Sequence, residues 1–171
     1  MKIRPALLAA LVALAPTSAL AQDVAGALTG HVAIADGDVG GGAMVDVWAP
    51  IDWLRLGGFL GVTSIPSSRD SHNRVATPIG ASIAAVIALS GPVRIEVRAR
   101  GGFWGGATQE VKLTIGGFFG GGAYLAFDLG GGVSLGGGLE VWAILGAGST
   151  WCVTPGLELS WGSPVAEPTP E

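Results

Sequence analysis

The sequence predicts an all-β protein, an eight-stranded antiparallel up-and-down transmembrane β-barrel. Charged residues make up 13% of the chain, about half the usual share for a soluble domain, and the mean hydropathy is positive. After the N-terminal segment there is no run of about 18 apolar residues free of Gly, Pro and charge, so spanning helices are not expected. Apolar and polar residues instead alternate, which is the period of a strand. A closed barrel then pairs every backbone polar group within a membrane.

Residues 1–21 have the composition of a secretory signal peptide. Lys2 and Arg4 form a positively charged start, a short apolar run follows, and Ala19 and Ala21 are the small residues that precede a cleavage site. A retained N-terminal anchor is the alternative. The expected division of the chain is a signal peptide at 1–21, the barrel at 22–161 and a short disordered periplasmic tail at 162–171.

Gly-rich or Asp-rich breaks divide the alternating part of the chain into eight segments. The fifth segment is the clearest, because Val93, Ile95 and Val97 share one face of the expected strand while Arg94 and Glu96 share the other. The connections after the odd-numbered strands are longer or more polar than the others, as the outer loops of membrane barrels are, so both termini are expected on the periplasmic side. The predicted strands lie near residues 24–35, 42–49, 53–63, 75–89, 93–104, 110–127, 132–147 and 151–161.

Alternation does not by itself decide which face of the sheet points inward. A soluble barrel of the lipocalin type, with its apolar face inward, is the main alternative. The fourth strand counts against it, because its second face carries Gly80, Ser82 and Ala84 in place of the Lys, Glu or Gln of a water-facing surface. Small residues suit the crowded interior of a narrow barrel. We therefore expect the face that combines small and charged residues to line the lumen.

This assignment gathers a set of charges inside the barrel, with His31 and Tyr124 nearby. Because an isolated buried ion costs several kcal/mol or more, these charges must pair or contact water. One interpretation is a salt-bridge network that fills the lumen; the other is a narrow conduit in which the Arg row of the fifth strand attracts anions. An eight-stranded interior is only just wide enough for its side chains, which favours the network. The expected lumen charges are Asp46, Arg55, Arg94, Glu96, Arg98, Arg100, Lys112, Glu140 and Glu158.

The last strand ends in a pattern of a polar residue, any residue, Gly156, two residues of any kind, the apolar Leu159, any residue and the aromatic Trp161. This resembles the C-terminal recognition pattern of outer-membrane barrel proteins, which implies delivery to the barrel-assembly machinery. With the signal peptide and seven preceding strands, the chain resembles the small eight-stranded barrels of the OmpA membrane-domain and OmpX class over about residues 24–161. The resemblance implies an outer-membrane location and contact with outer-membrane lipids. The chain departs from the family because Gly162 to Glu171 follow the terminal aromatic residue.

The expected function is therefore a non-enzymatic one, structural or in surface interaction. Some barrels of this size modify lipid A, but a hydrolase needs a nucleophile, a base and an orienting acid. His31 and His72 are the two histidines: the first is expected in the lumen and the second in a polar loop. A narrow pore, a lipid A enzyme and a soluble ligand carrier are the competing hypotheses.

Several partners are not expected. The chain lacks a basic cluster for nucleic acid, and it shows no metal-ligand spacing or cofactor motif. Cys152 is the single cysteine, so no internal disulfide forms, and we expect it to act as a small apolar filler. The sequence does not predict the oligomeric state.

Overall fold

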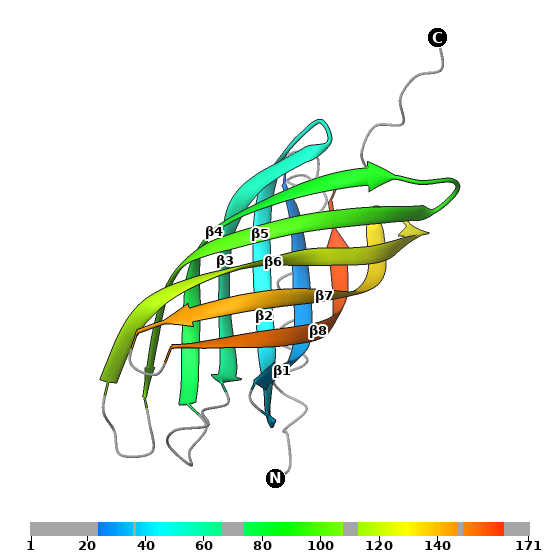
Figure 1. Cartoon of the computed structure of the whole chain (residues 1–171). Coiled ribbons are helices and arrows are strands. Elements are labelled where there is room, and N and C mark those ends of the chain that lie inside the picture. Colours follow the sequence, from blue (N-terminus) through cyan, green and yellow to red (C-terminus); the bar gives the residue numbers. More distant parts are fainter. Residues whose placement is uncertain (1–23, 36, 66–73, 108–112, 147–148, 163–171) are drawn as a thin grey trace, which may run out of the picture.

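The computed structural model describes residues 24–35, 37–65, 74–107, 113–146 and 149–162, and these residues form one closed barrel of eight strands (Figure 1). No helix in these ranges is long and apolar enough to cross a membrane. The predicted signal peptide, and the predicted tail beyond Gly162, lie outside the described residues. The strands are β1 (Ala25–Ala35), β2 (Asp38–Ile51), β3 (Leu54–Ile65), β4 (Arg74–Ala88), β5 (Val93–Ala107), β6 (Leu113–Gly130), β7 (Val133–Leu145) and β8 (Thr150–Trp161).

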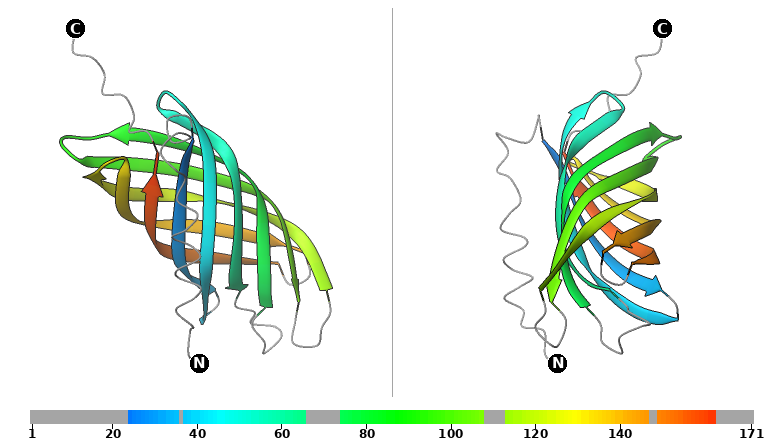
Figure 2. Two further views of the ribbon diagram at one scale, coloured as in Figure 1. Left: turned by 180° about the vertical axis from the view of Figure 1, so that it is seen from behind. Right: turned by 60° about the vertical axis from the view of Figure 1, so that its left-hand side comes forward.

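Every strand pairs antiparallel with the next in the chain, and β8 returns to pair with β1, so the sheet has no free edge. The strands are strongly tilted around the barrel (Figure 2). Strand β1 begins and strand β8 ends at the same end of the barrel, where Gly26 is in register with Trp161. We call this end the terminus end. The tight turns after β2, β4 and β6 lie at this end, and the connections after β1, β3, β5 and β7 lie at the opposite, loop end. The predicted fold class is confirmed.

The second strand is longer than the sequence predicts. It begins at Asp38 and not near residue 42, and it continues through Pro50 to Ile51. The Gly-rich start has the composition of a break, but it is paired strand: a Cβ at Gly42 would lie 2.0 Å from the carbonyl oxygen of Val62. Glycine therefore allows β2 and β3 to approach closely here. The Gly-rich composition, which is also typical of a turn, belongs in this segment to two tightly packed strands. The residues at 105–107 likewise belong to β5, and β7 ends at Leu145.

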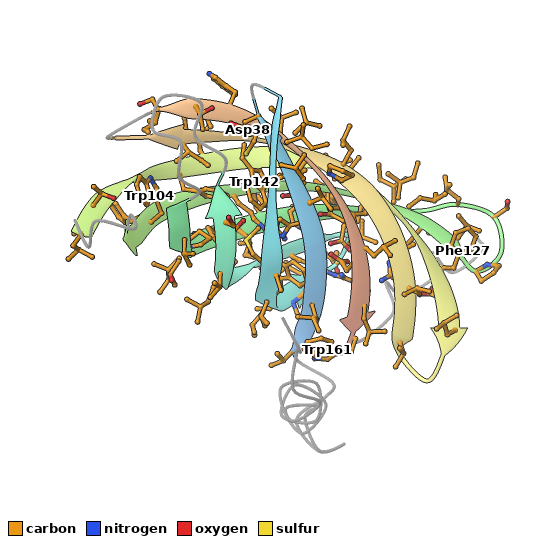
Figure 3. The ribbon with its side chains drawn as sticks, turned by 90° about the horizontal axis from the view of Figure 1, so that it is seen from below. Asp38, Trp104, Phe127, Trp142 and Trp161 are labelled. Atoms are coloured by element: carbon orange, nitrogen blue, oxygen red, sulfur yellow. The ribbon has the colours of Figure 1, made fainter. Side chains whose placement is uncertain are left out.

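The outer wall of the barrel is apolar. Aromatic side chains lie at both of its ends: Phe103 and Trp151 toward the loop end, and Trp53 and Phe127 toward the terminus end. Trp104 and Phe127, on β5 and β6, lie at opposite ends of the molecule (Figure 3). Large apolar residues exposed on the strands between include Val32, Val47, Leu60, Val62, Ile79, Ile87, Val97, Leu125, Leu139, Val141 and Val153. This surface matches the apolar band and aromatic girdles of a membrane barrel.

Candidate functional site

The functional feature of the structure is the lumen, which is filled by side chains from all eight strands. Strand alternation places them there, because the residues buried on β5 are Arg94, Glu96, Arg98, Arg100 and Trp104, while the residues between the four charged ones face outward or lie at the wall. The arginine side chains extend across the barrel to carboxylates on other strands. The lumen is therefore held together by contacts between strands that are not neighbours in the sheet.

Arg100 lies between two carboxylates. Its guanidinium donates to Asp46 on β2 through Nε at 3.2 Å and Nη2 at 2.5 Å, and Nη1 donates to Glu140 on β7 at 2.5 Å. Glu140 also accepts a hydrogen bond from Trp142 Nε1 at 2.6 Å. All four residues are buried. Arg100 thus connects β5 with two strands that are not its neighbours in the sheet, β2 and β7.

Arg98 is fully enclosed in the network, with a side chain that is 0% exposed. Its Nη1 lies 2.8 Å from Glu158 on β8 and 3.6 Å from Asp46, and its Nη2 pairs with Glu96. The guanidinium carbon lies 4.7 Å from the ring centroid of Trp48 and 4.8 Å from that of Tyr124. These cation–π contacts compensate part of the lost hydration of the ion.

Toward the terminus end, two further arginines continue the network. Arg55 on β3 donates to Glu96 at 2.9 Å. Arg94 pairs with Asp128 and donates to two hydroxyl groups, those of Ser134 at 2.7 Å and Ser160 at 3.0 Å. Among the described lumen residues the ion pairs therefore join four arginines to five carboxylates.

Toward the loop end, the lumen is filled by an apolar layer. Its rings pack against one another: Phe59 and Phe118 are tilted with centroids 5.5 Å apart, and Phe118 and Trp142 meet edge to face with centroids 5.2 Å apart. Trp104 donates its indole N–H to the carbonyl oxygen of Leu145 at 3.0 Å. We call this set of buried residues the apolar layer: Ala35, Met44, Phe59, Ala76, Trp104, Phe118, Trp142, Ile144 and Cys152.

His31 lies where the charged network meets the apolar layer. Its Nε2 is 3.0 Å from the hydroxyl oxygen of Thr63, and its ring packs edge to face on Trp142 at a centroid distance of 4.6 Å. The ring is buried inside the barrel. The imidazole is therefore packed among side chains of the lumen.

The structure brings together eight of the nine charges expected in the lumen. Lys112 lies outside the described residues. Asp128 joins the network from the terminus end with a side chain that is 40% exposed; alternation puts it on the face of Tyr124, but it is not among the predicted lumen charges. The apolar layer was also not predicted from the sequence. The alternation along β5 could have indicated it, because Trp104 lies an even number of residues from the four charged residues and therefore on the same face of the strand. The eight residues are Asp46, Arg55, Arg94, Glu96, Arg98, Arg100, Glu140 and Glu158.

The residues of the C-terminal pattern occupy distinct positions on β8. Gly156 lies on the inner face beside His31, Leu159 faces outward, and the ring of Trp161 covers Gly26 of β1. Their role as an assembly signal stays a prediction. Within the described ranges, no group of three or more His, Cys, Asp and Glu residues is arranged to hold a metal ion. Cys152 is buried in the apolar layer.

Comparisons with known proteins bear on the fold. No protein-family model and no curated protein sequence matches the chain. Several solved structures are similar in fold, among them the following two. Neisserial surface protein A, NspA, has a TM-score of 0.66 at 12% identity, and the match covers 82% of this chain and 96% of that one. The N-terminal β-barrel domain of Pseudomonas aeruginosa OprF has a TM-score of 0.50 at 12% identity, covering 82% and 98%. With its closed sheet, apolar wall and filled lumen, the chain has the fold of the small eight-stranded outer-membrane β-barrel proteins.

Proposed function

We propose that the chain is a non-enzymatic outer-membrane barrel with a structural or surface-interaction role and a lumen that does not conduct. The observation that carries this proposal is the filled lumen within an apolar wall. The lumen contacts of such a molecule stabilise the barrel in a bilayer. Its terminus end and its loop end are then the surfaces that can contact other molecules. We further propose that the loop end faces the outside of the cell, because short turns are typical of the periplasmic side.

Two layers in series oppose the passage of ions. Near the terminus end the arginines are paired with carboxylates, and an ion moving through would have to break pairs such as that of Arg100 with Glu140. Near the loop end the apolar layer offers no ligand to a dehydrated ion, which makes entry costly. The charged network therefore supports a structural role over a conduit.

The geometry counts against a lipid A enzyme and against a soluble ligand carrier. A catalytic histidine needs access to its substrate, and His31 is enclosed within the lumen; His72 lies outside the described residues. A soluble ligand carrier needs an apolar interior with room for a ligand, whereas a charged network and the apolar layer fill the interior of this barrel and its outside is apolar. One of the similar structures is named a surface protein, which agrees with a role for the outer rim.

The proposal is tested by electrical recording in planar bilayers combined with epitope accessibility in intact cells. We expect no stepwise conductance from the purified protein. We also expect that an epitope inserted within residues 66–73 binds antibody on intact cells, whereas the same epitope at Gly91, in the turn after β4, binds only after the outer membrane is opened. Reproducible conductance steps would establish the pore instead, and accessibility of the Gly91 epitope on intact cells would reverse the proposed orientation.

A further inference from the structure

A cavity of about 150 Å³ opens in the lumen at the terminus end, below the charged network. It is much smaller than the roughly 300–1,000 Å³ of pockets for drug-sized ligands. Its size suits a small ion or a single side-chain group with a few waters. The residues that line it are Arg55, Arg94, Asp128, Gly130, Gly131, Gly132, Val133, Ser134, Trp161 and Gly162.

The lining carries an excess of positive charge. Two guanidinium groups, those of Arg55 and Arg94, face one carboxylate, that of Asp128. Both arginines are more than nine-tenths buried, at 4% and 7% exposure. Glu96, which pairs with Arg55, does not line the cavity and also pairs with Arg98. The local field in the cavity therefore favours an anion.

The two arginines differ in the hydrogen-bonding capacity that they have left. Arg94 offers its positive charge and no free donor at the cavity surface, because its two Nη atoms are occupied by Asp128, Ser134 and Ser160 and its unpartnered Nε is buried. Arg55 donates from Nη1 to Glu96 and to no other side chain in the described part of the chain. Unsatisfied guanidinium donors next to a cavity recognise planar or tetrahedral oxygen groups well.

We propose that this cavity binds an oxyanion, a carboxylate or a phosphate, held by Arg55 and Arg94. Gly130, Gly131 and Gly132 line the cavity without side chains, so this part of its wall takes up little space. Two sources can supply the oxyanion. One is a free anion from solution. The other is the chain itself, because Gly162 lines the cavity and the sequence continues from there to Glu167 and Glu171.

Inorganic phosphate is the probe for the first test, added to the full chain in detergent micelles. The readout is the temperature at which half of the folded gel band is lost, because a ligand that binds only the folded state raises this temperature. We expect a rise of about 3 °C or more for each tenfold increase in phosphate above the dissociation constant, and none with sodium chloride at equal ionic strength.

The tail is tested as a source by the variant Glu167→Gln/Glu171→Gln. A phosphate response in the unmodified protein establishes a site open to free anions. A response in this variant alone, together with a lower midpoint without phosphate, identifies a tail carboxylate as the occupant. If neither protein responds to phosphate beyond the chloride control, the proposal is overturned.

A matched pair of turn variants locates the site without disturbing the charged network. Gly131 and Gly91 both have positive φ angles, +63° and +67°, both have open space around an added Cβ, and both lie in tight turns at the terminus end. Only Gly131 lines the cavity. We expect Gly131→Asp to reduce the phosphate response at least tenfold in apparent affinity, while Gly91→Asp retains it. Equal responses in the two variants would place the anion elsewhere and contradict the proposal.

Discussion

Arg100 shows at the scale of a single residue how the charges of the lumen depend on one another. It joins carboxylates from β2 and β7 in an environment that water does not reach, since the side chains of Arg100, Asp46 and Glu140 are at most 1% exposed. A buried ion pair adds little to stability compared with apolar residues, but removing one partner leaves an uncompensated charge. The arginines therefore add little net stability of their own. They are needed because the buried carboxylates around them would otherwise carry uncompensated charge.

We predict that Arg100→Met lowers the free energy of unfolding by about 3–5 kcal/mol, because Glu140 loses its partner inside the lumen. Denaturant unfolding in lipid vesicles measures the loss. The control is Asp38→Asn, which removes an exposed charge at the start of β2 and should change stability by less than about 0.5 kcal/mol. A loss of similar size in both variants would show that the buried pairing is not what makes Arg100 important.

At the scale of the strand, close approach of backbones decides where glycine is required. A Cβ at Gly42 would collide with β3, whereas a Cβ at Gly30 on β1 would meet no atom within 4 Å. We predict that Gly42→Ala destabilises the barrel by about 1–3 kcal/mol through strand separation, and that Gly30→Ala is close to neutral. Unfolding midpoints of the two variants compare the positions directly, and equal midpoints would contradict the packing described for β2 and β3.

The outward faces of the strands give a second prediction at this scale. Leu139 lies within β7 and Leu129 near the turn after β6, and both are exposed. In a bilayer, arginine costs about 2–4 kcal/mol at the midplane and about 0–1 kcal/mol near the interface. Leu139→Arg should therefore cost more stability than Leu129→Arg when unfolding is measured in vesicles. Equal, small costs would indicate that water surrounds this wall.

Alternation along a strand predicted which side chains point into the lumen, but not at which height along the barrel axis each one lies. It placed Arg94 to Arg100 inward because side-chain direction has a period of two. The contact of Arg98 with Glu158 depends on the tilt and stagger of strands that are not neighbours, and alternation contains no information on stagger. The same limit explains why Asp128 and the apolar layer were not recognised as parts of one filled interior. The start of β2 was missed because a Gly run is typical of both a turn and a close strand pair.

At the scale of the whole molecule, the barrel combines a charged, filled interior with an apolar exterior, which is the reverse of a soluble domain. In a membrane this inversion follows from the solvent: hydrocarbon would contact the wall, and the arginines of the lumen pair with its carboxylates. The closed hydrogen-bonded sheet leaves no unpaired edge. Such a molecule is stable only where hydrocarbon surrounds its wall, so we infer that the chain resides in a membrane as a closed barrel.

The most direct test is a heat-modifiability gel of the detergent-folded protein, combined with membrane fractionation of cells that express the full chain. A closed barrel resists unfolding in detergent until it is heated, so the unheated and heated samples should migrate differently, and the protein should be found in the outer-membrane fraction. A soluble periplasmic protein with no heat-dependent shift would contradict residence in the membrane, because the apolar wall would then have to face water.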